Sequence, residues 1–398
     1  MNPDQENKRP VLLFFAAWWP QPTSPGSGIF IKEHGRSLLP HFDVHVVHLK
    51  VEKDLTIPLY NIDFDHEDVD GLQVHQITVR LRFRRFGLHD RFVRRGYSEL
   101  LQRLSAEFDF DRYCINVRSH LTQLIPSLPE LRDLPFVLIE HFSYYQRTVL
   151  QLEPSKRRVE TKNIRHWFGD PNLRRVLTVS EDLKETLINH FQVEASKVSL
   201  IFNVAHPSFC YSTTTTALED PLRFICAGIW EAPKRLDLLF DVLCRYVNPQ
   251  RKLVFDIFGS GSQVDECVLR ASSLPPNILV KFHGFQAKEV ISSLMRRAHA
   301  LVHPTDAENA PTVISEAQCC GLPVLSMAVN GIPEMVPSTC GILVTADDEQ
   351  ALNVGLESLI ERMEAFDRKA IAQRGNDRYS MSAVGERLSQ YILNIGHG

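Results

Sequence analysis

The feature that most constrains this chain is a repeated alternation of short apolar runs with longer amphipathic stretches. The runs VLLFFAA (11–17) and PFVLIEH (135–141) are continuously apolar, whereas the stretches between such runs have helical spacing. Continuous apolar strands separated by helices predict a parallel sheet that is covered on both faces. Three further runs complete the first set: DVHVVHL (43–49), YCINV (113–117) and RVLTVS (175–180).

The same alternation starts again near residue 222. The segment before it, 203–222, contains a run of threonines and has no periodicity, which indicates a linker. Because 398 residues exceed one ordinary core, we expect two domains. The predicted division is an N-terminal domain at 1–205, a linker at 206–220, a C-terminal domain at 221–378 and a final amphipathic helix at 379–398.

The predicted fold class is therefore α/β, with two Rossmann-like doubly wound domains that face each other across a cleft. Ligands of open α/β sheets bind outside the carboxyl ends of the strands. Two facing domains make the cleft between them the expected binding site.

Composition excludes some functions and favours others. The net charge of −4 gives no sign of a nucleic-acid partner. Eight scattered cysteines form no C-x-x-C pair, which indicates reduced, buried thiols and a cytoplasmic location. No apolar run approaches the roughly 18–20 residues of a membrane span. No Cys/His group has zinc spacing, so no metal site is predicted.

Two residues of the first predicted domain follow apolar runs. Gly28 lies just before a helix, in the loop WWPQPTSPGSGIF, where backbone N–H groups could face an anion. A plain turn explains that loop equally well. His141 ends the run IEH and is expected at the lip of the cleft, although a structural histidine is the simpler interpretation.

The stretch AGIWEAPKRLDLLF of the second domain places two cations before a helix. Gly228 ends a predicted strand, and Lys234 and Arg235 open the next helix. Cations at a helix N-terminus oppose the helix dipole, by a few tenths of a kcal/mol or more. An anionic ligand at this point removes the conflict, and a solvated Lys-Arg pair is the alternative.

A second stretch, HPTDAENAPTVISEAQCCGLPVLS (303–326), holds two glutamates eight positions apart. Glu308 lies in a predicted loop, and Glu316 lies two turns into a helix that begins near Pro311. Backbone amides in the segment Asn309, Ala310, Pro311 and Thr312 could face a phosphate. Carboxylates bind vicinal hydroxyls by accepting two hydrogen bonds, so both glutamates are candidates for polyol contacts. Two unrelated surface glutamates are the alternative.

Two further patterns have simpler explanations. The D-x-D tripeptides Asp63–Asp65 and Asp109–Asp111 could hold a divalent cation on a diphosphate, but the first lies in an acidic, loop-like run and the second just before a strand. Residues 80–96 hold seven arginines and three phenylalanines. That mixture suits an anionic membrane surface or a polyanionic acceptor, and a solvated face is the alternative.

Taken together, these residues resemble glycosyltransferase family 4, the group 1 retaining enzymes with the GT-B fold. ENAPTVISEAQCCGLPV resembles the family's E-x7-E signature, and VSEDL, KVSLIFNVAHPSF, AGIWEAPKRLDLL, FDIFGSGS and VKFHGF precede it in the family's order. The resemblance implies a nucleotide-diphospho-sugar donor, a glycan or lipid-linked acceptor and no metal cofactor. It also implies that the final helix returns to the first domain.

The resemblance further assigns roles to residues. Glu308 would bind the donor sugar, with the segment 309–312 on sugar and diphosphate, and Glu316 would hold the ribose. Lys234 would neutralise the diphosphate, Gly28 would let the backbone approach it, and His141 would contact the sugar. The family usually has an arginine where this chain has Ile229, and Arg235 is a partial replacement. The alternatives are a non-catalytic partner subunit of the same fold and a sugar-nucleotide epimerase.

Overall fold

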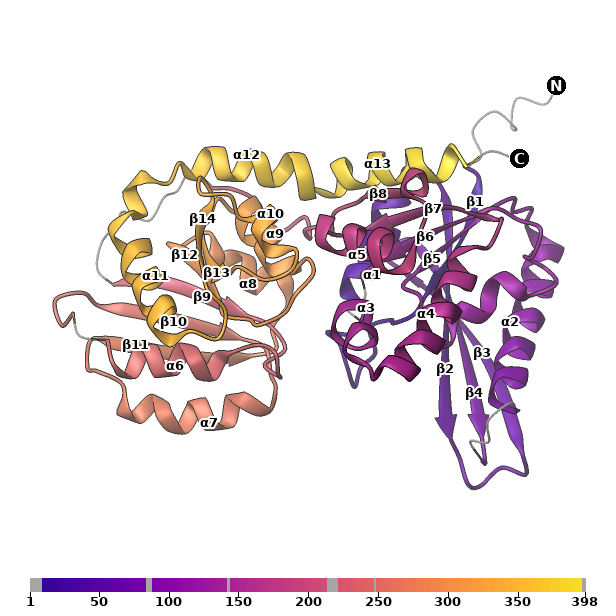
Figure 1. Ribbon diagram of the computed structural model, residues 1–398, viewed down its shortest axis with the longest axis horizontal. Helices are drawn as coiled ribbons and strands as arrows, with labels where there is room; N and C mark the ends of the chain where they lie inside the picture. The colour runs from indigo at the N-terminus through magenta and orange to yellow at the C-terminus, as the bar shows by residue number, and fades with distance from the viewer. Residues whose placement is uncertain (1–8, 84–87, 142–143, 213–220, 247, 396–398) are drawn as a thin grey trace. The chain divides into compact units, whose positions relative to one another are not determined.

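The computed structural model describes residues 9–83, 88–141, 144–212, 221–246 and 248–395 (Figure 1). The chain divides into two compact units. Unit 1 comprises Met1–Val179, Leu183–Ile201 and Val384–Gly398, and unit 2 comprises Ser180–Asp182 and Phe202–Ala383. Most of the predicted linker, residues 213–220, lies outside the described residues.

Unit 1 contains an eight-stranded sheet in the order β3-β4-β2-β1-β5-β6-β7-β8. All neighbouring strands are parallel except β3 and β4, which are antiparallel. The predicted runs form buried strands, as a sheet covered on both faces requires. The strands are β1 (Val11–Ala16), β2 (Asp43–Lys53), β3 (Tyr60–Val69), β4 (Leu72–Leu81), β5 (Tyr113–Asn116), β6 (Phe136–Glu140), β7 (Leu173–Thr178) and β8 (Val198–Leu200).

The β3–β4 hairpin corrects one interpretation of the sequence. Asp63 and Asp65 lie within strand β3 rather than in a loop, and Asp63 forms an ion pair with Arg80 of the neighbouring strand β4. The two strands are joined by Asp70 and Gly71, both with positive φ, as a two-residue hairpin turn requires. The D-x-D pair at 63–65 is therefore part of the exposed face of an edge strand.

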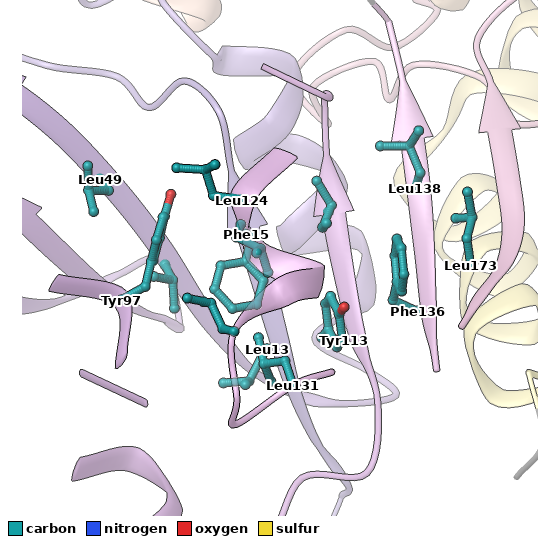
Figure 2. Close-up of a cluster of buried hydrophobic side chains, with 14 of the residues drawn as sticks. Leu13, Phe15, Leu49, Tyr97, Tyr113, Leu124, Leu131, Phe136, Leu138 and Leu173 are labelled. Atoms are coloured by element: carbon teal, nitrogen blue, oxygen red, sulfur yellow. The ribbon is translucent and has the colours of Figure 1, made fainter. Parts of the chain in front are cut away.

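The core of unit 1 lies between this sheet and its helices. Phe15 of β1 packs edge-on against Tyr113 of β5 with ring centroids 5.8 Å apart, and Tyr113 stacks on Phe136 of β6 at 5.0 Å (Figure 2). The helices of this unit are α1 (Ile29–Leu38), α2 (Leu88–Glu107), α3 (Tyr144–Arg147), α4 (Pro154–Phe168) and α5 (Glu181–Phe191), with short 3-10 turns that include η2 (Thr122–Ser127).

Unit 2 contains a six-stranded, fully parallel sheet in the order β11-β10-β9-β12-β13-β14. Its strands are β9 (Leu222–Ala227), β10 (Leu253–Phe258), β11 (Ile278–Gly284), β12 (Ala300–His303), β13 (Val324–Met327) and β14 (Gly341–Val344). Its helices are α6 (Leu236–Cys244), α7 (Ser262–Arg270), α8 (Lys288–Met295), α9 (Thr312–Cys319), α10 (Ile332–Met335), α11 (Glu349–Glu361) and α12 (Arg368–Tyr379). The predicted α/β class with two Rossmann-like sheets is confirmed.

The last helix, α13 (Met381–Leu393), contributes most of its length to unit 1. The guanidinium of Arg112 donates to the carbonyls of Ile392 and Leu393, at 3.1 and 2.9 Å. A Cβ atom at Gly385 would lie 2.1 Å from the carbonyl oxygen of Ser37, so only glycine permits this contact with α1. These contacts attach the end of α13 to the first sheet and its helices.

Two further observations concern the hydropathy of the helices and the state of the cysteines. Among the described residues, the helices are all too short or too polar to pass through a bilayer. The eight cysteines are free thiols, and all except Cys210 and Cys244 are buried, in line with the reduced, buried thiols that the sequence predicts.

Candidate functional site

The loops after β9 and β12 meet at the carboxyl end of the sheet in unit 2. The Arg235 amide donates to the carbonyl of Pro304 at 3.1 Å, and the Asp306 amide donates to the carbonyl of Pro233 at 3.0 Å. An isolated antiparallel bridge thus joins Lys234 to Thr305. This bridge explains why two segments that are far apart in the chain lie together.

Lys234 and Glu308 form an ion pair at this point. Nζ of Lys234 lies 2.7 Å from Oε1 of Glu308, and the two side chains are 13% and 29% exposed. Lys234 also lies 3.4 Å from Nε2 of His303, the last residue of β12. Burial, with the neighbouring ammonium, holds the pKa of His303 well below its ordinary value. His303 is therefore neutral, and its Nε2 accepts from the ammonium.

The start of α9 lies directly after this pair. The first amides of a helix have no acceptor within the helix, so they can donate to an anion. The helix begins at Thr312 with Pro311 as its N-cap, and proline has no N–H, so Thr312 supplies the helix amide of the predicted segment, whereas the amides of Asn309 and Ala310 precede the helix. Asn203 donates to the carbonyl of Ala310 at 2.7 Å, and this bond holds the segment in place.

Glu316 lies one to two turns further along α9 and has a different partner. Its side chain is 5% exposed, and its Oε1 lies 2.6 Å from Nζ of Lys288 at the start of α8. The carboxylate is thus charge-compensated in a nearly buried position. Lys288 also lies 5.6 Å from the ring centroid of Phe209, close enough for a cation–π contact.

Arg235 is more strongly engaged than the sequence suggested. Its guanidinium binds the carboxylates of Asp237, Asp306 and Asp347, and these acceptors raise its pKa. Those three carboxylates already resolve the charge conflict at the start of α6 for which an anionic ligand was expected. Ile229, which stands at the family's arginine position, is 60% exposed.

Gly228 lies where strand ends pack tightly together. Its N–H donates to the carbonyl of Phe258, and a Cβ at Gly259 would lie 1.8 Å from the carbonyl oxygen of Gly228. Gly259 has a φ of 104°, which other residues rarely adopt. Glycine at position 259 is therefore needed for the close approach of the segments that follow β9 and β10.

Gly28 in unit 1 has a clear structural reason to be glycine. It has a φ of 68° at the start of α1, and a Cβ there would lie 2.6 Å from the carbonyl group of Trp18. The close approach of Trp18 thus accounts for the glycine without a ligand. The contact of Gly28 with a diphosphate stays a prediction.

His141 follows β6 and lies among aromatic rings. Its ring centroid is 4.5 Å from that of Phe30 and 5.2 Å from that of His34, both on α1. Burial, and secondarily His34, lower the pKa of His141 well below its ordinary value, so the imidazole is neutral. The preceding residue, Glu140, is fully buried and accepts N–H groups from His141 and Arg118 at 2.9 and 3.1 Å.

The structure thus brings Lys234, Glu308, Gly228 and the start of α9 together, with Glu316 separately paired on the same helix. It also brings the helix after Gly28 next to His141 within unit 1. Neither His303 nor Lys288 was predicted from the sequence. The position of His303 at the end of β12 was a usable signal, because strand ends line such sites, whereas nothing in the sequence linked Lys288 to Glu316.

Comparison with solved structures defines the fold class. Sucrose-phosphate synthase from Thermosynechococcus elongatus superposes with a TM-score of 0.70 at 18% identity, covering 96% of this chain and 98% of that one. The Anabaena protein HepE, solved in complex with UDP-glucose, gives 0.66 at 16% identity, covering 96% and 99%. These neighbours have the GT-B fold, and this chain shares it.

Two family models match the chain. Residues 25–209 match Glycosyltransferase Family 4, and residues 214–377 match Glycosyl transferases group 1. The chain belongs to this family of glycosyltransferases.

Parts of the chain are also similar in sequence to named glycosyltransferases. The gpi3 subunit of phosphatidylinositol N-acetylglucosaminyltransferase from Schizosaccharomyces pombe is 27% identical over 180 residues, 45% of this chain and 39% of that protein. The 2-deoxystreptamine N-acetyl-D-glucosaminyltransferase of Streptomyces fradiae is 30% identical over 149 residues, 36% and 35% of the two chains. Each of these matches spans less than two thirds of the relative's own length.

Proposed function

We propose that this chain is a retaining glycosyltransferase that moves a sugar from a nucleotide-diphospho-sugar to a glycan or lipid-linked acceptor. The observation that carries the proposal is the Lys234–Glu308 pair beside the start of α9. A cation, a carboxylate and the backbone amides of a helix start together match the diphosphate and the hydroxyls of such a donor. The complexes of HepE with UDP and with UDP-glucose support this class of donor.

Each part of the donor has a proposed partner. Lys234 neutralises the diphosphate, and the amides of Asn309, Ala310 and Thr312 contact sugar and phosphate. Glu308 accepts from the sugar hydroxyls, and Glu316 holds the ribose while Lys288 compensates its charge. Gly228 lies at the diphosphate end, whereas the charge of Arg235 is already balanced by three carboxylates. The contacts of Gly28 and His141 with the donor stay predictions.

The neutral state of His303 supports the role of Lys234. An ammonium has three N–H donors. Two of them are directed to Glu308 and His303 in the described part of the chain, which leaves a third for a phosphate oxygen. A protonated His303 would repel the ammonium and would be charged in a desolvated position, so its depressed pKa preserves this arrangement.

The proposed mechanism uses no protein nucleophile. The acceptor attacks from the face that the nucleotide leaves, and the departing phosphate takes the acceptor's proton. The protein contributes by positioning the reactants and by stabilising the charge that develops on the diphosphate. We propose that the transfer itself needs no metal, because Lys234 and the amides of α9 supply the positive charge.

A donor panel tests the proposal. The full chain is incubated with sugar nucleotides of several bases and sugars, with and without acceptor glycans, and nucleotide release and sugar isomerisation are measured. Acceptor-dependent release, with the anomeric configuration retained by NMR, is the expected result. Acceptor-independent isomerisation indicates an epimerase, and binding without turnover of any donor indicates a non-catalytic partner subunit.

An anionic membrane surface is the proposed location of the acceptor, with the protein peripheral on its cytoplasmic side. Arg91 and Arg95 of α2 and Phe83 before it are exposed, which suits residues 80–96 to such a surface. Phe92 of the same stretch belongs to the core, and residues 84–87 lie outside the described residues. These observations limit the proposed surface to the exposed arginines and Phe83.

Vesicle co-sedimentation tests this surface. Wild type is expected to bind vesicles that contain anionic lipid and not to bind neutral vesicles. The variant Arg91→Glu/Arg95→Glu is expected to lose most of the binding to the anionic vesicles. The variant Arg158→Glu/Lys162→Glu makes the same charge change on exposed residues of α4 and serves as the control. Equal losses in both variants assign binding to net charge and remove the role of residues 80–96.

A further inference from the structure

Two histidines and an aspartate gather in unit 1, apart from every residue assigned to the donor. His89 and Asp90 lie at the start of α2, and His120 lies in the loop between β5 and η2. Nδ1 of His89 is 3.2 Å from Oδ1 of Asp90, and Nε2 of His120 is 3.3 Å from the same oxygen. One ligand atom from each residue lies within 4.8 Å of the other two.

The spacing fits a divalent metal ion. Ligand atoms at about 2.0–2.1 Å from a tetrahedral zinc ion lie roughly 3.3–3.4 Å from one another. The two distances to Asp90 are close to this length, and the nitrogens of the two histidines lie within 4.8 Å of each other. Two imidazoles and one carboxylate form a donor set that suits zinc, cobalt or nickel better than magnesium or calcium.

Local hydrogen bonds hold the loop that carries His120. The amide of Ser119 donates to the hydroxyl of Thr122 at 2.8 Å, and that hydroxyl donates to the carbonyl of Val117 at 2.7 Å. The Gln123 side-chain amide lies 3.3 Å from Nδ1 of His120. The oxygen of the same amide accepts from the Arg118 guanidinium at 3.0 Å, so both ends of the Gln123 amide have a neighbour. A metal on Nε2 leaves the ring proton on Nδ1, where it meets the Gln123 NH2 group, so metal binding requires this amide to shift away from the ring.

The loop that carries His120 lies at an edge of the sheet where ligands commonly bind. Strand β1 lies between β2 and β5, and β2 follows it in the chain whereas β5 comes later. The loops after β1 and β5 therefore flank the point where the strand order reverses, which is where ligands of open α/β sheets bind. His120 belongs to the loop after β5.

We propose that His89, Asp90 and His120 bind one divalent transition-metal ion of the zinc type. The ion ties the start of α2 to the loop after β5 and keeps an open coordination position, because the protein supplies three ligands. His120 and Asp90 are 60% and 41% exposed, so the open position is accessible to water or to an oxygen of a bound molecule. None of the three ligands is a residue assigned to the donor, so a failure to bind metal leaves the proposed transfer reaction untouched.

Calorimetric titration of the chelator-stripped full chain with zinc chloride at neutral pH tests the site. We expect one equivalent to bind with a Kd of about 10 µM or tighter. At a free zinc concentration of about 100 times Kd, the melting temperature should rise by about 2–4 °C. Titration with cobalt chloride should give the visible spectrum of a nitrogen- and oxygen-ligated ion, without the charge-transfer band of a thiolate.

Variants at the exposed ligands locate the ion. His120→Ala and Asp90→Asn should each weaken binding at least tenfold, and His89→Ala/His120→Ala should abolish it. His166→Ala replaces an exposed histidine of α4 and should bind as wild type does. The proposal is overturned if wild type binds no equivalent tighter than about 0.1 mM, if the double variant retains the affinity, or if the cobalt spectrum shows thiolate ligation. Unchanged circular dichroism of the variants ensures that a loss of binding is not a loss of fold.

Discussion

The ammonium of Lys234 lies 2.7 Å from a carboxylate oxygen of Glu308, and this pair joins the loop after β9 to the loop that precedes α9. The backbone bridge between Lys234 and Thr305 fixes the same two loops. The pair therefore has a defined geometry before a donor arrives. For the proposed donor, a cation whose position is already set lowers the entropy lost when the diphosphate binds.

Removing the cation tests this arrangement first. Lys234→Ala should lower kcat/KM for the true donor more than tenfold, because a charge-assisted contact contributes about 2 kcal/mol or more. Steady-state nucleotide release measures the effect. Lys281→Ala removes an exposed lysine of β11 in the same unit and should leave kcat/KM unchanged. A Lys234→Ala enzyme within twofold of wild type would show that another group neutralises the diphosphate.

The carboxylate has a separate test. Glu308→Gln keeps the shape of the side chain but weakens its acceptance from sugar hydroxyls and removes the charge beside Lys234. We expect kcat/KM to fall about tenfold or more, while the free energy of unfolding changes by less than about 1 kcal/mol, because the pair is partly exposed. Glu289→Gln, at an exposed position of α8, is the control. A large fall in stability with normal turnover would make Glu308 a structural residue.

The packed histidines of the first sheet predict a pH dependence of stability. Nδ1 of His45 lies 3.0 Å from Nε2 of His75, and the ring of His66 stacks on that of His75 at 4.7 Å. Burial, with the two neighbouring imidazoles, lowers the pKa of His75 to about 4. Burial also lowers the pKa of His45, against the opposing effect of Asp43.

The sign follows from the depressed pKa of His75. Near pH 7 the imidazole of His75 is mostly neutral in both the native and the unfolded protein. As pH falls from about 6.5 towards 4, His75 binds a proton in the unfolded chain but not in the native protein. Stability is therefore lost over this window. Urea unfolding at pH 7 and pH 5 should show a smaller loss for His75→Gln than for wild type, by roughly 1–2 kcal/mol. His190→Gln changes an exposed histidine, so this variant should lose as much stability between pH 7 and pH 5 as wild type does. Equal losses in all three proteins would show that His75 does not cause the pH dependence of stability.

The close approach of Trp18 to Gly28 predicts that Gly28→Ala and Gly71→Ala differ in stability. Gly28→Ala places a Cβ 2.6 Å from backbone atoms of Trp18, whereas at Gly71 the nearest atom is the tip of the Leu39 side chain at 3.3 Å. Both positions have positive φ and share a penalty of about 1–2 kcal/mol. Thermal and urea unfolding should show a larger loss of stability for Gly28→Ala, by about 1 kcal/mol or more. Equal losses would mean that the loop at Trp18 moves aside freely.

The repeated strands were predictable because they are buried on both faces. Each continuously apolar run became a strand of a parallel sheet, within two residues at its ends except for β2, which continues four residues further to Lys53. The β3–β4 hairpin was missed because β3 is an edge strand with one polar face, so its sequence resembles that of an acidic loop. Its turn, Asp70-Gly71, was a usable signal for a two-residue hairpin.

The candidate site was predictable in its residue types but not in its pairings. Lys234 and Glu308 followed from a motif, whereas their direct contact depends on a bridge between two loops that no local pattern encodes. The same limit applies to Arg235. Its three carboxylate partners come from α6, the loop after β12 and the segment after β14, so the charge balance of this arginine exists only in the folded unit.

The attachment of α13 to unit 1 has a consequence for synthesis on the ribosome. Residues 384–395 are translated after the whole of unit 2, yet they supply the contacts of Gly385 with Ser37 and of Ile392 and Leu393 with Arg112. The first unit to emerge from the exit tunnel therefore lacks these contacts until α13 has been synthesised. A chain that ends prematurely within α13 would therefore leave unit 1 incomplete even though all of its other segments had been made.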